Sequence, residues 1–174
     1  MTTGSARIPN SFFQRAVTEV APDLLGKKLV RRFDDGLVQE YIITETEAYR
    51  GHDDKACHAN KGKTARTEVM FREGGLVYVY LIYGMYWLLN FVTGPEGDAS
   101  AVLIRGLHGI SGPGRVGKAL QLDKSFYGED LSTSNRIWLE ETDAKVNYSA
   151  LPRVGIDYAG EPWISKPWRF IAEK

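Results

Sequence analysis

The sequence is poor in residues that cross-link chains or hold metals. It has one cysteine and three histidines in 174 residues. Cys57 alone cannot form an internal disulfide, and His52, His58 and His108 lack the paired spacing of a zinc site. No charged segment followed by an apolar run opens the chain. We therefore expect no metal and no other cofactor, and a reducing, cytoplasmic location, close to the nucleoid in a bacterium.

The sequence also lacks net charge. It has 22 basic and 22 acidic residues, so a nucleic-acid partner cannot be argued from global charge and needs a local patch. The segment 55–72 is the candidate, although a merely solvated loop is the simpler explanation of it. No repeat, linker or low-complexity segment is present. The chain therefore reads as one domain, residues 1–174, with residues 1–9 expected to be flexible.

One long run has no charge at all, residues 75–95. Its length would suffice for a membrane span. Tyrosines, Gly84 and Asn90 interrupt it, and its β-branched and aromatic content favours strands. We expect a hairpin that turns at residues 83–85 and no membrane association.

Most of the remaining pattern is typical of strands. Residues 11–14 have the form of a capping box, so a short helix should follow Ser11, and residues 22–26 suggest a second turn. A further helix is expected over about 115–121. Strands are expected over 27–33, 38–49, both halves of the hairpin, 101–107, 137–141, 153–158 and 168–171. Because the strands cluster rather than alternate with helices, the prediction is an α+β fold with a curved, mainly antiparallel sheet.

Two carboxylates end the second expected strand. Alternation places Tyr41, Ile43, Glu45, Glu47 and Tyr49 on one face, so the acids continue an apolar stripe. Carboxylates held against apolar groups cluster at catalytic sites. The simpler alternative is that one acid ends the strand and pairs with Arg31 or Arg50, and this segment alone does not decide between the two.

The glycine-rich residues 112–118 fit two nucleotide-binding patterns. Ala119 stands where the phosphate loop needs Ser or Thr, and the turn at 111–113 is not the buried strand that a dinucleotide site requires. Both patterns are therefore rejected. What remains is an anion site at a helix start, where glycine amides and Arg115 would hold a phosphate, for example of DNA.

Aromatic and basic side chains near the hairpin complete the pattern. Tyr78 and Tyr80 share a strand face, whereas Tyr83 should project from the turn, although tyrosines are common in strands anyway. His58 follows Cys57 directly, and neighbouring side chains seldom face each other, so a Cys-His dyad is rejected and an aromatic wall is expected. We expect Arg105 to pair with one of the carboxylates, and this pair could serve either structure or catalysis.

Together, these residues resemble the alkyladenine (3-methyladenine) DNA glycosylase family. The resemblance spans nearly the whole chain, from residues 12–13 and 24–26 to 137–140. It includes Thr46-Glu47-Ala48-Tyr49, Cys57-His58, Met70-Phe71, residues 78–86, Asn90, residues 102–105, residues 112–114 and Ala119-Leu120.

The resemblance implies a role for each matching residue. Glu47 activates a water molecule and Arg105 helps to hold it. Tyr49, His58 and Tyr80 sandwich a flipped base, Asn90 discourages a guanine amino group, and Tyr83 fills the gap left in the duplex. Further DNA contacts are expected from Met85, Lys63, Arg66, Arg115 and Lys118.

The implied activity is that of a monomeric, monofunctional enzyme of base excision repair. It would bind double-stranded DNA containing damaged purines and hydrolyse the N-glycosidic bond of 3-methyladenine and 7-methylguanine, with hypoxanthine and ethenoadenine as further candidates. An abasic site would remain. A non-catalytic damage-binding protein and a small-nucleoside hydrolase are the alternatives. Thr67, Arg50 and Cys57 depart from or vary within the family pattern, which leaves the lesion range open.

Overall fold

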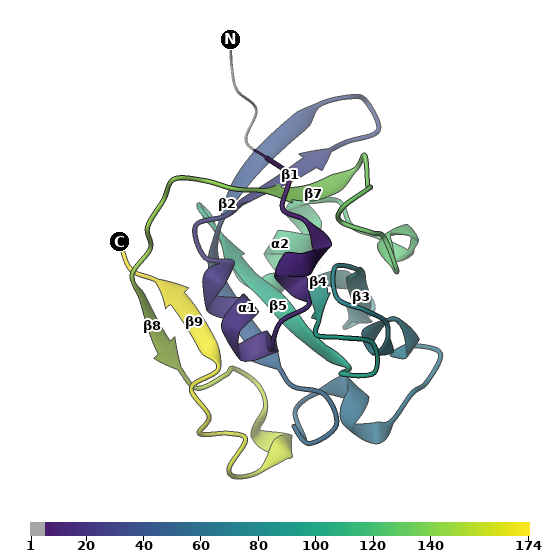
Figure 1. Ribbon diagram of the computed structural model, residues 1–174, viewed down its shortest axis with the longest axis vertical. Helices are drawn as coiled ribbons and strands as arrows, with labels where there is room; N and C mark the ends of the chain where they lie inside the picture. Colours follow the sequence, from purple (N-terminus) through teal and green to yellow (C-terminus); the bar gives the residue numbers. More distant parts are fainter. Residues whose placement is uncertain (1–5) are drawn as a thin grey trace.

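The computed structural model describes residues 6–174 (Figure 1). Its two α-helices are α1 (Val17–Asp23) and α2 (Pro113–Ala119). Its strands are β1 (Lys28–Arg32), β2 (Val38–Tyr49), β3 (Val77–Ile82), β4 (Tyr86–Thr93), β5 (Ser100–Leu107), β6 (Ile110–Ser111), β7 (Ile137–Glu140), β8 (Tyr148–Leu151) and β9 (Arg169–Ala172). Five 3-10 turns join them, at Asn10–Phe13, His58–Lys61, Glu68–Phe71, Lys124–Phe126 and Asp157–Ala159.

All the strands belong to one antiparallel sheet. Its main order is β3-β4-β5-β2-β1-β7, with β6 beside β5, and with β9 between β2 and β8. The long strand β2 pairs with β1 over its first half and with β5 and β9 over its second half, so the sheet curls around it (Figure 1). The predicted α+β fold with a curved, antiparallel sheet is confirmed.

The sheet separates the hydrophobic core from a cavity. In β3, β4 and β5 one set of alternate residues, including Val79, Leu89 and Val102, packs in the core with side chains of α1 and α2. The other set, which includes Tyr80, Asn90 and Leu103, lines the cavity. Each of these strands therefore supplies core residues from one face and cavity-lining residues from the other.

Strand β2 departs from strict alternation, which corrects the predicted faces. Ile43 is buried in the same core cluster as Ala48, although their positions differ in parity. Thr44 in β2 and Arg105 in β5 have no partner in the ladder between these strands, so the pairing is irregular there. Such bulges reverse which side chains face which side. Glu47 and Tyr49 consequently lie on the face opposite to Ile43 and do not continue its apolar stripe.

The bulge leaves little room on the facing strand. A Cβ at Gly106 would lie 3.1 Å from Thr44 Oγ1 and 3.2 Å from Glu45 Cβ. These distances are tighter than ordinary carbon contacts, so a side chain at this position would push β2 away. Glycine at position 106 therefore allows the two strands to approach where their pairing is irregular.

Three other predictions need correction. Residues after Ser11 form only a 3-10 turn with no side-chain cap, and the α-helix begins at Val17. Pro22 lies inside that helix rather than in a separate turn. Residues 153–158 are not a strand, because Gly155 has a positive φ of 73° and a 3-10 turn follows at Asp157. The strand on this side is β8, whose residues are all exposed.

The chain start is described from Ala6 onward. Part of the predicted flexible segment, residues 1–5, lies outside the described residues. Ile8 is 1% exposed and its amide donates to the Leu139 carbonyl, so it is held against the sheet.

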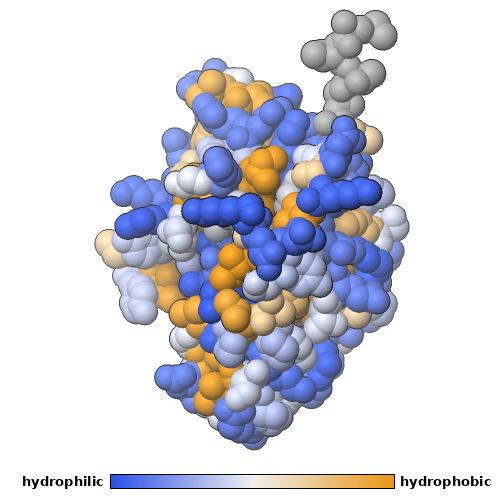
Figure 2. Space-filling model, turned by 90° about the vertical axis from the view of Figure 1, so that its left-hand side faces the viewer, coloured by the Kyte–Doolittle hydropathy of each residue, from blue (hydrophilic) through white to orange (hydrophobic). Residues whose placement is uncertain are grey.

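The remaining expectations concern the hairpin and the glycine-rich segment. Residues 75–95 form the predicted β3–β4 hairpin, and none of the described helices is long and apolar enough to cross a membrane. Before α2 comes β6, which pairs antiparallel with β5 rather than opening a parallel unit. This arrangement agrees with the rejection of a dinucleotide site. Figure 2, which faces the side of β8 and β9, shows apolar residues in separate groups among hydrophilic ones, as is normal for a globular surface.

Candidate active site

A cavity of about 560 Å³ opens on the face of the sheet opposite to the core. This volume is within the range of pockets that hold a small organic group. Strands β2, β3, β4 and β5 supply its floor, and the loops around His58 and Ile156 supply its sides. Of the sequence-predicted residues, the cavity brings together Tyr49, His58, Arg66, Tyr80, Tyr83, Asn90 and Arg105.

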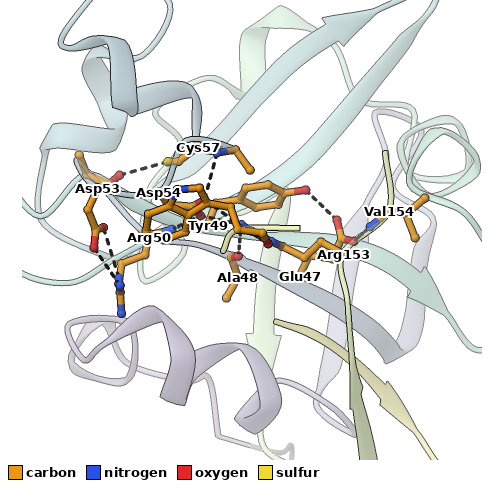
Figure 3. A network of polar contacts seen from close by, with 12 residues as sticks. Glu47, Ala48, Tyr49, Arg50, Asp53, Asp54, Cys57, Arg153 and Val154 are labelled. Carbon is orange, nitrogen blue, oxygen red and sulfur yellow. Dashed lines mark hydrogen bonds and ion pairs between the residues drawn. The ribbon is translucent and has the colours of Figure 1, made fainter. Parts of the chain in front are cut away.

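Glu47 is fully buried and does not itself line the cavity, but it contacts Tyr49, Arg105 and Val154, which do (Figure 3). The Tyr49 hydroxyl donates to its Oε1 atom at 2.8 Å, and the Val154 amide donates to its Oε2 atom at 2.7 Å. Arg105 Nη1 is 3.6 Å from Oε1. Because a carboxylate oxygen can accept two hydrogen bonds, Oε1 retains capacity for one further donor, such as water.

Arg105 is held by a second carboxylate. Its Nε donates to Glu45 Oε2 at 3.2 Å, and Arg169 Nη1 lies 3.4 Å from the same oxygen. Arg31 instead bonds the Leu120 carbonyl, and Arg50 pairs with Asp53. The alternative in which an acid of β2 pairs with Arg31 or Arg50 is therefore wrong.

The surroundings of Glu47 oppose its ionisation. Burial raises the pKa of Glu47, while Arg105, the Val154 amide, the Tyr49 hydroxyl and Arg153 limit the rise. Burial likewise raises the pKa of Tyr49 well above its ordinary value, and the neighbouring Glu47 carboxylate adds to this effect. Tyr49 therefore stays protonated and remains a donor to Glu47.

His58 and Cys57 have different surroundings. His58 Nδ1 lies 2.9 Å from the Tyr78 hydroxyl, and its ring contacts Tyr80 edge to face with centroids 4.5 Å apart. The Cys57 thiol is buried, donates to the Ala99 carbonyl, and has its pKa raised to about 12 by burial. It is therefore an uncharged thiol whose hydrogen bond is made to Ala99, while His58 bonds Tyr78, which agrees with the rejection of a dyad.

Burial, reinforced by Arg66, lowers the pKa of His58 to about 4. The folded protein thus binds this proton less readily than the unfolded chain, whose value is near 6.5. The contribution of neutral His58 to the free energy of unfolding is fully present above pH 6.5 and is lost as the pH falls toward 4. Wild type should therefore lose unfolding free energy when the pH is lowered from about 7 to about 5. In a His58→Asn variant, whose amide can still contact Tyr78, we expect this loss to be smaller by about 2 kcal/mol. Urea titrations at both pH values measure this, and equal losses would contradict it.

The β3–β4 turn projects beside the cavity. Tyr83 is 84% exposed and has a positive φ of 53°, and Met85 is 65% exposed. Gly84 also has a positive φ, which a glycine adopts without strain. The prediction that Tyr83 projects from the tip is confirmed at the level of geometry.

The four predicted DNA-contacting cations are exposed. Arg66 stacks 5.1 Å from the Tyr80 ring centre at the cavity edge. Lys63 is in the same loop, whereas Arg115 and Lys118 lie on α2. Within the described part of the chain, none of the four makes an ion pair within 4.0 Å, so their charges remain available to an anion.

Sequence reasoning missed several residues of the site. Val154 and Tyr158 come from the C-terminal loop (residues 152–160), which the prediction treated mostly as a strand; Pro152, Gly155 and Gly160 were the signals for a loop. Asp54 and Arg153 form a fully buried ion pair behind Tyr49. No local signal distinguishes this acid from Asp53, which is exposed. Across residues 6–174 no group of three or more His, Cys, Asp or Glu side chains could hold a metal ion.

Comparison with known proteins assigns the chain to a family. The family model described as methylpurine-DNA glycosylase matches residues 11–111 and 108–174. A protein of Methanocella arvoryzae is 44% identical over 94% of this chain and 90% of its own length. Proteins of Rickettsia felis and Legionella pneumophila are each 43% identical over 94% of this chain, and over 92% and 93% of their own lengths. All three are provisionally named 3-methyladenine DNA glycosylase. The chain therefore belongs to the methylpurine-DNA glycosylase family of enzymes.

Proposed function

We propose that the protein removes alkylated purines, 3-methyladenine and 7-methylguanine first, from double-stranded DNA. It does so by hydrolysing the N-glycosidic bond with a water molecule activated by Glu47. The family and the names of the relatives support the substrate class. The observation that carries the mechanism is the contact of buried Glu47 with Arg105 and Tyr49, which line an aromatic cavity large enough for a purine.

The cavity offers what a flipped purine requires. Tyr49, His58 and Tyr80 provide aromatic surfaces for stacking, and neutral His58 adds no charge against a cationic base. Asn90 is 3% exposed on the cavity face of β4, and its amide nitrogen donates to the Tyr78 carbonyl at 3.2 Å. This position suits a residue that disfavours the amino group of guanine.

The chemistry needs a base more than an acid. A cationic alkylated purine is a good leaving group, so one carboxylate and a held water molecule suffice. In the proposed reaction Oε1 of Glu47 takes the proton of the water, while Arg105 orients the water from the other side. A neutral base such as hypoxanthine also needs protonation, so its removal should depend on pH differently.

The lesion range and the product test the proposal. The protein is incubated with duplexes carrying one 3-methyladenine analogue, 7-methylguanine, ethenoadenine or hypoxanthine, and the free base is measured. We expect free base and a strand that breaks only after alkali, because no lysine lines the cavity to form a Schiff base. A borohydride-stable adduct would contradict monofunctional hydrolysis. Binding without base release would favour the non-catalytic alternative.

Tyr83 tests the contribution of base flipping. If its ring fills the gap in the duplex, Tyr83→Ala loses part of the energy that offsets unstacking, which is a few kcal/mol. We expect base release from duplex DNA to fall about 10- to 100-fold and release from single-stranded DNA to change little. Tyr148→Ala, which removes another exposed tyrosine on β8, is the matched control. An equal loss on both DNA forms would argue against gap filling.

A further inference from the structure

The buried pair of Arg153 and Asp54 connects several segments behind the catalytic end of the cavity. Arg153 Nη1 and Nη2 donate to the two Asp54 carboxylate oxygens at 2.6 Å and 3.0 Å. Both side chains are 0% exposed. Bidentate geometry of this kind fixes orientation as well as distance. The guanidinium group therefore cannot move without moving Asp54.

Asp54 is fixed in turn by the backbone of its own loop, residues 50–57. Its Oδ2 atom accepts the Arg50 amide at 3.0 Å, and its Oδ1 atom accepts the Ala56 amide at 3.0 Å. The carboxylate thus joins both ends of the turn that follows Tyr49 (Figure 3). These two backbone hydrogen bonds orient the carboxylate independently of Arg153.

Arg153 also contacts the strand that carries Glu47. Its Nη1 donates to the Ala48 carbonyl at 3.0 Å, and its guanidinium carbon lies 4.9 Å from the centre of the Tyr49 ring. The next amide along the chain, that of Val154, donates to Glu47 Oε2. The same residue that anchors the C-terminal loop therefore places one donor of Glu47 directly and supports the ring of the other donor, Tyr49.

We propose that the Arg153 and Asp54 pair is a positioning device that fixes Glu47 and Tyr49 for catalysis by anchoring the C-terminal loop against β2. The pair touches neither cavity nor substrate, since neither side chain lines the cavity. The catalytic consequence of this positioning rests on the proposed function of Glu47. An exposed surface contact could tie down the loop as well, but it would not place a fixed cation against Tyr49.

The charges around Glu47 predict the direction of the effect. Burial is the main cause of the raised pKa of Glu47, and Arg153 and the Val154 amide act against it by favouring the ionised carboxylate. Losing these two contacts while Glu47 stays buried should therefore raise its pKa further. Arg105 would still act against this rise. The other titratable groups near Glu47 are Tyr49, Tyr80 and Tyr158, together with Glu45, which shares Arg105 with it, and Arg169, which is its partner in the β2–β9 ladder.

Three variants test the proposal. Arg153→Lys keeps the charge but loses the bidentate contact, and the double variant Arg153→Met with Asp54→Asn removes both charges together, so that neither is left buried alone. Glu141→Gln, which removes an exposed partner of Lys27, is the control. Urea unfolding gives the folded fraction of each, so that all rates are expressed per folded molecule.

The first readout is single-turnover base release as a function of pH. We expect the double variant to lose about 10- to 100-fold, because small misplacements of a catalytic group cost this much. Its acid limb should move to higher pH, and Arg153→Lys should lie between the double variant and wild type. Unchanged rates and an unchanged acid limb per folded molecule would show that the pair serves stability alone.

The second readout does not need activity. Carbon-13 labelling of glutamate carboxyls, with the Glu47 resonance assigned by its absence in Glu47→Gln, reports the titration of Glu47 directly. A midpoint that moves to higher pH in the double variant supports the positioning role. An unmoved midpoint overturns it. Because this holds even if the wild type releases no base, failure of the proposed function and failure of the positioning role are distinguishable.

Discussion

Replacing Glu47 by glutamine should lower single-turnover release of alkylated purines by about 10³-fold, the usual contribution of a general base. The glutamine side chain has the same shape and can still accept from the Val154 amide. Binding of damaged duplex should therefore persist while hydrolysis is lost. Base release and duplex affinity, measured on the same preparations, separate the two effects.

The pH profile adds a second criterion for Glu47. Since burial raises the pKa of this carboxylate, wild-type activity should increase with pH through that raised value, above the range of an exposed glutamate. The activity of the Glu47→Gln variant should lack this increase with pH. Glu40→Gln, which changes an exposed carboxylate earlier on β2, is the matched control and should behave as wild type. If the residual activity of Glu47→Gln showed the same increase with pH as wild type, the general base would be another group.

The largest effect on stability should come from Asp54→Asn. The change leaves Arg153 buried without its partner, and breaking a buried pair on one side costs about 3–5 kcal/mol. The amide also turns donors toward backbone amides that Asp54 now accepts. Urea unfolding measures the loss.

Two further variants calibrate this value. Glu141→Gln makes the same chemical change in an exposed pair and should cost about 0–1 kcal/mol. Adding Arg153→Met to Asp54→Asn should restore part of the loss, because no uncompensated charge then remains. A double variant with a lower free energy of unfolding than Asp54→Asn alone would contradict this account.

Local pattern was enough to predict much of this fold. The hairpin β3–β4, strand β5 and the class of the sheet followed from alternation and turn residues, which act over a few positions. Alternation also placed Tyr78 and Tyr80 on one face and Tyr83 at the tip, as found. These features depend on backbone geometry that the local sequence determines.

Features that depend on distant partners were not predictable. The two faces of β2 were misassigned because the irregular pairing involves Arg105, far along the chain. The partner of Asp54 is 99 residues away, in a loop predicted as a strand. The roles of Glu47 and of the aromatic walls came from family resemblance, and the structure shows only that these residues lie together.

The irregular pairing of β2 and β5 also bears on how such a site could arise or disappear. If Thr44 were present but paired regularly, alternation from Ile43 would point Glu47 and Tyr49 at the hydrophobic core, and Thr46 and Ala48 at the cavity. The irregular pairing is therefore what allows a strand of this length to present the site. A variant whose two strands paired regularly here would lose the site while keeping every one of its residues. The local geometry of the strand is thus a marker of the activity that residue identity alone would miss.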